Sequence, residues 1–316
     1  MYSQPALVRV LFFLQFIIKF THHCKVDELG ILLYNKIVME DEIVLLVDFM
    51  YLWNRIYYAI GQNQGGDYYA HMLGIMEKIN INSDYNKKYI VLDGINGTQR
   101  QKELLSSYKE GRAPKAEVYA KINQFVRECT TNYVNLNFVR ANNHEADEVI
   151  ASLAIKFSKK NKKVFIYSGD KDLLQLLVYP NISVGMKYTG NFQLQPFSED
   201  ELKKKMDTIS NGVLTEVGDI LKFRVFRGDA SDKIPPAIPR FPSKIIKELI
   251  DNVWKGVTSF NDDIFADMVL YLYNNNKEKY SKQLVESFDD VSRNWELMQL
   301  QFVPYREIIK EVVKLN

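Results

Sequence analysis

The chain has 316 residues, of which 47% are hydrophobic and 25% charged, and its formal net charge at pH 7 is +2. This length can bury a substantial core, and the composition is typical of a globular protein rather than a disordered or fibrous one. The near-neutral total does not indicate nucleic-acid binding, so any such function must come from local charge. Cys24 and Cys129 fit neither a disulfide framework nor a zinc site, and we expect a reducing, cytoplasmic setting.

Residues 6–18 form an apolar run that Arg9 and Gln15 interrupt. The run is too short to cross a bilayer, and its flanks do not resemble those of a signal peptide. An amphipathic or buried helix, a dispensable leader and a targeting segment all stay open for residues 1–40. Met39 is an alternative start, because the organised pattern begins just after it.

From residue 41 the pattern alternates between strands and helices. Four short apolar runs predict buried strands, at 43–47, 88–92, 134–139 (the weakest) and 163–167. Residues 145–159 carry apolar side chains at helical spacing and predict an amphipathic helix. Strands that alternate with helices predict an α/β domain with a mostly parallel central sheet over residues 41–215.

Beyond about residue 200 the strand pattern fades and helical patterns dominate. The Pro-rich stretch 233–242 is the best boundary signal, because prolines break both helices and sheet ladders. We therefore expect a helical region over residues 216–316.

Acidic residues follow the ends of three predicted strands. Asp48 and Asp93 come directly after their strands, and Asp170 and Asp172 lie a few residues after the third. Ligands of an open parallel sheet bind outside the carboxyl ends of its strands, so we expect these acids to meet at one edge. The start of the predicted helix and a later loop supply five more, namely Glu145, Asp147, Glu148, Asp229 and Asp232.

Each acid also has an ordinary structural explanation, since helix dipoles favour acids in a first turn and Asp is common in turns. Their repetition at equivalent strand ends favours convergence instead. Two like charges about 4 Å apart cost roughly 4 kcal/mol near a protein surface, so such a cluster needs cations. Oxygen ligands favour Mg²⁺ or Mn²⁺ over Zn²⁺, and we interpret His144 as structural.

A basic and aromatic segment follows Asp93. Residues 98–121 contain Arg100, Lys102, Tyr108, Lys109, Arg112, Lys115, Tyr119 and Lys121. Cations attract phosphate and bases stack on aromatic rings, although a solvated helix face with alternating charges would look similar. Beside an acidic metal pocket, the segment favours phosphate binding and metal-assisted phosphodiester cleavage.

Five motifs, in order, resemble the 5′-nuclease superfamily: flap endonucleases, bacteriophage 5′–3′ exonucleases and the 5′-nuclease domain of DNA polymerase I. The motifs are LLVDFMYLWNRIYYA, VLDGINGTQRQKELLSSYKEGRAP, HEADEVIA, SGDKDLLQL and FRGDASDKIPP. The resemblance covers roughly residues 43–250. It implies a PIN-like fold with a helical arch near residues 98–127, through which a single-stranded 5′ end passes.

The resemblance also implies roles for individual residues. It implies that a first metal ion is held by Asp48, Asp93, Glu145 and Asp147. It implies that a second ion is held by Asp147, Asp170, Asp172 and Asp229, with Glu148 and Asp232 acting directly or through water. Lys109 and Arg112 would act at the scissile phosphate and the arch. By the same resemblance Arg55 would touch phosphate, and the basic segment itself offers Arg100, Lys102, Tyr108 and Lys115 as contacts to nucleic acid.

Three departures from the family pattern matter. The acidic helix start ends in Glu148, where the family usually has Asp, so the preferred metal can differ. The family's glycine-rich helix–hairpin–helix, which grips duplex DNA with a monovalent cation, is degenerate here. Prolines and Phe241 replace its glycines, and duplex binding would depend on Arg240, Lys244 and Lys247.

The third departure concerns the start of the predicted helix. Helical geometry places Glu145 and Glu148 together, with Asp147 on the other flank. All three acids can therefore serve one site only if the helix begins at about Glu145.

The sequence thus predicts a stand-alone, structure-specific 5′ nuclease of the kind that bacteriophages encode, with two Mg²⁺ or Mn²⁺ ions. As a 5′–3′ exonuclease and flap endonuclease, it would cleave branched or nicked DNA, or RNA–DNA duplex, during replication. We expect a monomer without a membrane partner, with replication proteins as candidate partners. Two alternatives stay open, a PIN-like single-strand ribonuclease and a catalytically silent DNA-junction binder. Chain length, the arch-like insert and the GDASD loop disfavour the first, and the intact acid set disfavours the second.

Overall fold

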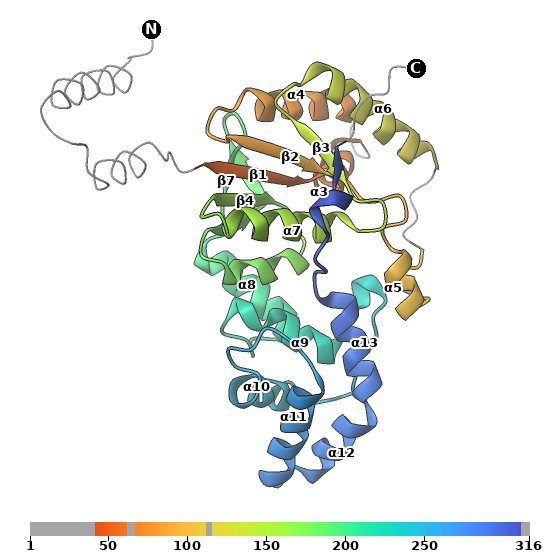
Figure 1. Ribbon diagram of the computed structural model, residues 1–316, viewed down its shortest axis with the longest axis vertical. Helices are drawn as coiled ribbons and strands as arrows, with labels where there is room; N and C mark the ends of the chain where they lie inside the picture. The colour runs from red at the N-terminus through yellow and green to blue at the C-terminus, as the bar shows by residue number, and fades with distance from the viewer. Residues whose placement is uncertain (1–41, 62–66, 112–115, 311–316) are drawn as a thin grey trace, which may run out of the picture. The chain divides into compact units, whose positions relative to one another are not determined.

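Six strands of the computed structural model form one sheet, in the order β5-β4-β1-β2-β3-β8. Their bounds are β1 Ile43–Asp48, β2 Lys87–Val91, β3 Asn137–Arg140, β4 Lys163–Tyr167, β5 Ile182–Gly185 and β8 Ile309–Lys310. All neighbouring strands are parallel except β3 and β8, which pair antiparallel. The mostly parallel sheet is confirmed, and the sequence pattern missed β5 and β8 (Figure 1).

The structure describes residues 42–61, 67–111 and 116–310. The alternatives for residues 1–40 therefore lie outside the described residues, as do Arg112 and Lys115. No helix within the described ranges is long and apolar enough to cross a membrane.

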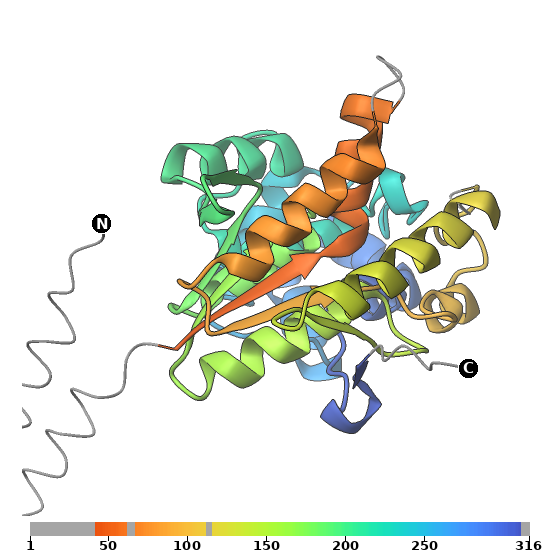
Figure 2. The ribbon, with the colours of Figure 1, turned by 90° about the horizontal axis from the view of Figure 1, so that it is seen from above.

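Alternation along β1 gives the sheet two apolar faces. Leu45 and Val47 face a cluster that includes residues of α3 (Phe49–Ile56), α4 (Tyr68–Ile81) and α6 (Ala116–Asn132). Val44 and Leu46 face a second cluster built largely on α7 (Ala146–Ser158). Helices thus cover both faces, as a parallel sheet requires (Figure 2).

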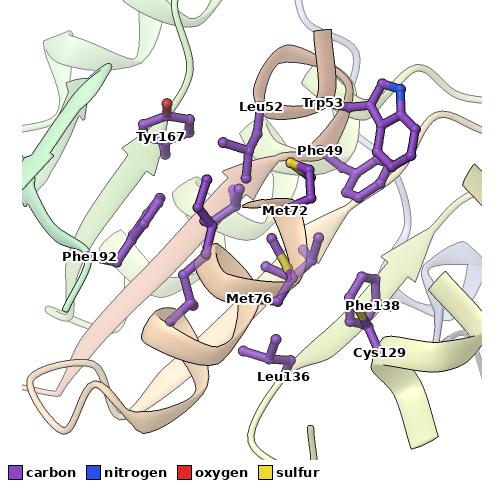
Figure 3. Packing of buried hydrophobic residues seen from close by; sticks show 14 of the residues in the cluster. Phe49, Leu52, Trp53, Met72, Met76, Cys129, Leu136, Phe138, Tyr167 and Phe192 are labelled. Carbon is purple, nitrogen blue, oxygen red and sulfur yellow. The ribbon is translucent and has the colours of Figure 1, made fainter. Parts of the chain in front are cut away.

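Large side chains fill the first of these clusters. Phe49 and Trp53 of α3 pack with Met72 and Met76 of α4, all almost fully buried (Figure 3). The Phe49 and Trp53 rings lie 5.7 Å apart between centroids. This packing fixes α3 against the sheet, and with it the Asp48 carboxylate at the junction of β1 and α3.

The second half of the chain is mainly helical. Its helices are α8 Glu199–Ser210, α9 Ile220–Arg227, α10 Ser243–Asn252, α11 Asp262–Asn274, α12 Glu278–Glu286 and α13 Phe288–Met298. They share a third core, in which Phe241 is 1% exposed and stacks on Phe226. The Pro-rich stretch 233–242 therefore contributes to this core, and the described residues from Ile43 onward belong to one compact unit.

The end of the described chain returns to the sheet. After α13, the Val303 N–H donates to the Ser152 hydroxyl of α7 at 2.7 Å. Strand β8 then pairs with β3 at the edge of the sheet. The helical half is therefore attached to the α/β half at both of its ends.

A glycine brings the end of β2 against the start of α7. The Gly94 N–H donates to the His144 carbonyl at 3.0 Å. A Cβ atom added at Gly94 would lie 2.1 Å from the Ala141 carbonyl oxygen. This close approach sets Asp93 beside the first turn of α7, where the Ala146 N–H donates to its carboxylate at 2.9 Å.

We expect Gly94→Ala to destabilise the protein by about 1–3 kcal/mol, because the methyl group must displace backbone atoms. Gly74→Ala is the matched control, since a Cβ atom at Gly74, within α4, meets nothing within 4 Å. It should be neutral or stabilise by up to about 1 kcal/mol through helix propensity. Urea denaturation measures both, and equal effects of the two substitutions would contradict the close packing at Gly94.

Candidate metal centre

A cavity of about 710 Å³ lies at the carboxyl ends of β1, β2 and β4. Its lining includes six carboxylates, from Asp48, Asp93, Glu145, Asp147, Asp170 and Asp232. A carboxylate oxygen of Asp172 also lies within 4.8 Å of oxygens of Asp147 and Asp170. Seven of the nine acids singled out in the sequence thus gather at this edge, and Glu148 and Asp229 are not among the lining residues.

Hydrogen bonds from hydroxyl and backbone N–H groups orient the acids at the strand ends. Asp48 caps α3, accepting from the Tyr51 N–H at 3.0 Å and from the Ser168 hydroxyl at 2.8 Å. Asp170 accepts from the Asp172 N–H at 2.9 Å. These neutral donors fix the carboxylates without supplying positive charge.

The three acids at the start of α7 do not all reach the cavity, and the pair that does differs from the predicted one. Glu145 is the N-cap, with extended backbone (φ −73°, ψ 160°), and the helix begins at Ala146. Glu145 and Asp147 therefore both reach the cavity. Glu148 is buried and binds Arg100 at 3.0 Å and His144 at 2.9 Å. The helix does begin where one shared site requires, but the expected pairing of Glu145 with Glu148 is wrong, because a non-helical cap residue projects away from the helical face.

The basic segment after β2 closes one side of the cavity. Glu145 accepts from Lys109 Nζ at 2.5 Å, from the Tyr108 hydroxyl at 2.8 Å and from Gln101 at 3.3 Å. Lys109 has a left-handed backbone (φ 50°) and its N–H donates to the Asp232 carbonyl at 3.0 Å. Lys109 therefore lines the cavity, as its predicted role at a phosphate requires.

Asp172 and Asp229 are paired with cations of the protein itself. Arg224 of α9 binds both carboxylates, with its Nη2 at 2.5 Å from Asp229. Lys171 Nζ lies 2.7 Å from Asp229. Burial alone raises the pKa of Asp229, but its bonds to Lys171, Ser231 and Arg224 lower that pKa below the ordinary value.

Two carboxylates of the cavity, by contrast, have pKa values above the ordinary value of aspartate. Burial, with added repulsion from Asp93 and Asp170, raises the pKa of Asp48 to about 7. Burial and the neighbouring Glu145 raise the pKa of Asp147 well above its ordinary value. Both carboxyl groups therefore hold protons more readily than an exposed aspartate does, although Lys109 offsets part of the rise at Asp147. Carboxylate oxygens of Asp147, Asp170 and Asp172 lie within 4.8 Å of one another, and such an oxygen-only set fits a hard divalent cation.

Most residues expected at nucleic acid lie outside the cavity lining. Arg55 binds the Tyr167 hydroxyl at 3.1 Å and the Met186 carbonyl. Arg100 and Tyr108 are committed to Glu148 and Glu145. The remaining described members are exposed or partly exposed, namely Lys102, Arg240, Lys244 and Lys247, and Lys247 pairs with Asp251 at 2.5 Å.

Sequence reasoning missed several residues of the cavity. Lys204, Lys205 and Thr208 of α8 lie on its lining, together with Lys171 and Tyr51. Lys205 Nζ lies 4.6 Å from the centroid of the Phe197 ring. The ELKKKM stretch has the charge pattern of a solvated helix, and only its helical spacing hinted that Lys204 and Thr208 share a face.

Comparison with known proteins finds clear relatives. Residues 43–207 match the family model of the 5′–3′ exonuclease N-terminal resolvase-like domain. A 5′–3′ exonuclease of Mycoplasmopsis pulmonis is 30% identical over 226 residues, which cover 67% of each chain. Flap endonuclease Xni of Shewanella halifaxensis is 28% identical over 268 residues, or 81% of this chain and 92% of the relative.

A solved structure shares the fold. The flap endonuclease of bacteriophage T5, in a complex with DNA and metal ions, superposes with a TM-score of 0.55 at 18% identity. The match covers 82% of this chain and 89% of that chain. The likeness therefore extends beyond the sheet into the helical half.

The raised pKa of Asp48 predicts a pH dependence of stability. Between its ordinary value of 3.8 and about 7, folded metal-free protein keeps a proton that the unfolded chain releases. Stability must then fall as pH rises through this window. In EDTA, we expect the melting temperature to decrease from about pH 4 to about pH 7, and to decrease less in Asp48→Asn.

Asp267→Asn is the control, because Asp267 is an exposed acid of α11. Its pH profile should match that of the wild type. Identical profiles for all three proteins would show that Asp48 titrates normally.

Proposed function

Because this chain belongs to the 5′–3′ exonuclease family, we propose that it is a divalent-metal-dependent 5′ nuclease that hydrolyses phosphodiester bonds in DNA. One observation carries the proposal: carboxylates from three strand ends and a helix start converge on a cavity that also holds lysines. Metal-assisted hydrolysis of a phosphodiester uses both, since metal ions activate water and cations bind the phosphate.

The acids of the cavity are the proposed metal ligands. Asp48, Asp93, Glu145 and Asp147 would hold one ion, and Asp147, Asp170 and Asp172 a second. Asp232 also lines the cavity and would act directly or through water. We propose Mg²⁺ or Mn²⁺ as the ions, since the ligands are oxygens alone. Bound ions supply a water of lowered pKa and neutralise the charge that develops on the phosphate.

Lys109 is the proposed catalytic cation of the chain. Burial lowers its pKa, but the carboxylates of Glu145, Asp147 and Asp232 outweigh burial and hold that pKa above the ordinary value. The ammonium group therefore stays charged at any working pH. From the cavity wall it would stabilise negative charge on the phosphate oxygens in the transition state. The matching role of Arg112 stays a prediction.

Helix α8 offers a second set of cations on the cavity lining. A capping box at Ser198 and Glu201 fixes its first turn, and Lys187 binds Glu201 at 2.5 Å. Lys204 and Lys205 thus project from a braced helix and would bind backbone phosphates of the strand that enters the cavity. The duplex-binding roles of Lys102, Arg240, Lys244 and Lys247 stay predictions.

The substrate class follows from the relatives. Proteins named 5′–3′ exonuclease and flap endonuclease match most of the chain, which supports DNA with a 5′ flap, nick or 5′ end as substrate. RNA–DNA duplex, a monomeric state, a cytoplasmic location and work alongside replication proteins are further parts of the proposal. Replication is supported by related chains named DNA polymerase I, one of them 25% identical over 203 residues.

We expect the protein to cleave a labelled 5′-flap DNA in Mg²⁺ and to lose this activity in EDTA. Asp170→Asn should lower the cleavage rate by at least about 10²-fold, because it removes a ligand charge from the cavity. Binding of the flap in Ca²⁺ should survive the substitution. Asp267→Asn, which makes the same chemical change on exposed α11, should cleave like the wild type.

Substrate comparison separates the proposal from its alternatives. Faster cleavage of single-stranded RNA than of flap DNA would indicate the PIN-like ribonuclease. Tight binding of the flap by the wild type without any cleavage in Mg²⁺ or Mn²⁺ would indicate a silent junction binder. Cleavage that EDTA leaves intact would reject the metal-dependent mechanism.

The α8 lysines predict a salt-dependent contribution to DNA affinity. We expect Lys205→Ala to weaken flap binding about fivefold and to reduce the slope of log Kd against log salt by about 1. Lys203→Ala is the matched control, since Lys203 is an exposed neighbour that does not line the cavity. Fluorescence anisotropy in Ca²⁺ at several salt concentrations measures the flap affinity of both variants. Equal salt slopes for the two variants would show that the α8 lysines of the cavity do not bind backbone phosphates.

A further inference from the structure

We propose that Arg224 is a resident cation of the second metal site. In the metal-free protein Arg224 positions Asp172 and Asp229, and its positive charge weakens binding of the second divalent ion. The inference rests on the proposed two-ion nuclease, and it concerns how tightly the second ion is held. Arg224 acts through the two carboxylates and is a positioning residue.

The buried Arg224 side chain binds two carboxylates at once. The residue lies on α9 and is 3% exposed. Its Nη1 binds the Asp172 carboxylate and its Nη2 lies 2.5 Å from Asp229 Oδ2. The planar guanidinium presents its donors in a fixed fork, so a single side chain holds two acids from separate segments. Asp172 begins the 3₁₀ segment Asp172–Val178, and Asp229 follows α9.

A second cation completes the charge balance on this side. Lys171 Nζ lies 2.7 Å from Asp229, and Lys171 also lines the cavity. Two carboxylates thus meet two protein cations. Asp48 and Asp93 instead accept from neutral donors, a hydroxyl and backbone N–H groups. The first site has one protein cation, Lys109 on Glu145, for its four carboxylates, whereas Asp172 and Asp229 are both paired with cations of the chain.

Asp172 is the residue at which the two kinds of cation compete. One of its oxygens lies within 4.8 Å of oxygens of Asp147 and Asp170, so it belongs to the group that could hold an ion. The same carboxylate is bound to Arg224. A guanidinium does not lose its proton in proteins, so an ion at Asp172 meets a full positive charge close by. The repulsion lowers the affinity of the second ion relative to the first.

Mn²⁺ alone is the probe for this inference, measured by calorimetry and by the EPR signal of free Mn²⁺. The wild type should bind one Mn²⁺ at least about tenfold more tightly than a second. Arg224→Met should tighten the second site about tenfold and leave the first within about twofold. The matched control is Arg227→Met, one turn further along α9, because Arg227 contacts Ser243 and the Phe223 ring rather than a carboxylate.

Thermal melting supplies a readout that a merely structural role would not move. Without metal, Arg224→Met leaves the buried Asp229 and the partly buried Asp172 with one cation fewer, so its melting temperature should fall. Saturating Mn²⁺ should raise the melting temperature of Arg224→Met more than that of the wild type or Arg227→Met. An equal loss of stability with and without Mn²⁺, together with unchanged Mn²⁺ affinities, would overturn the proposal.

A second variant keeps the test decisive if Arg224→Met does not fold under either condition. Arg224→Lys retains the charge but loses the fork, so one carboxylate is released and the second Mn²⁺ should bind about threefold more tightly. An unchanged second affinity in this variant would equally overturn the proposal. A wild type that binds Mn²⁺ as expected but cuts no flap would reject the proposed function alone. Normal cleavage with unaltered Mn²⁺ binding in the Arg224 variants would reject only the present inference.

Discussion

Repulsion between carboxylates at the carboxyl edge of the sheet is the constraint around which this molecule is organised. Three strands and one helix start each deliver an acid to the same cavity, and hydrogen bonds from neutral groups hold these acids in place. Burial, with repulsion from neighbouring acids, raises the pKa values of Asp48 and Asp147, so ionising these two groups is unfavourable. The metal requirement, the flanking lysines and the Arg224 bridge all answer this single electrostatic problem.

The fold serves the same constraint through two local devices. Gly94 lets the end of β2 approach the turn before α7, which sets Asp93 against the Ala146 N–H. Glu145 leaves the helical path as the N-cap of α7, so it reaches the cavity beside Asp147. Both depend on backbone geometry over a few residues, and both bring acids from distant sequence positions to one candidate metal centre.

The local sequence pattern predicted the features that depend on neighbouring residues, namely the buried strands and the acids that follow them. The apolar runs before Asp48 and Asp93 marked strands β1 and β2, and the position of an acid just past each run predicted the shared edge. Two-residue β8 has too little pattern to detect, and its pairing with β3 depends on where α13 ends. Glu148 contacts Arg100, and Arg224 contacts Asp172, across about fifty residues of sequence, and no periodicity encodes such long-range pairs.

The central claim is that the clustered acids share divalent ions, and anomalous diffraction from crystals grown in Mn²⁺ tests it most directly. We expect an anomalous peak within coordination distance of Asp147 and Asp170. At higher Mn²⁺ concentration we expect a second peak in the same cavity. Cavity carboxylates without any peak at saturating Mn²⁺, with ions bound only at other surfaces, would contradict it.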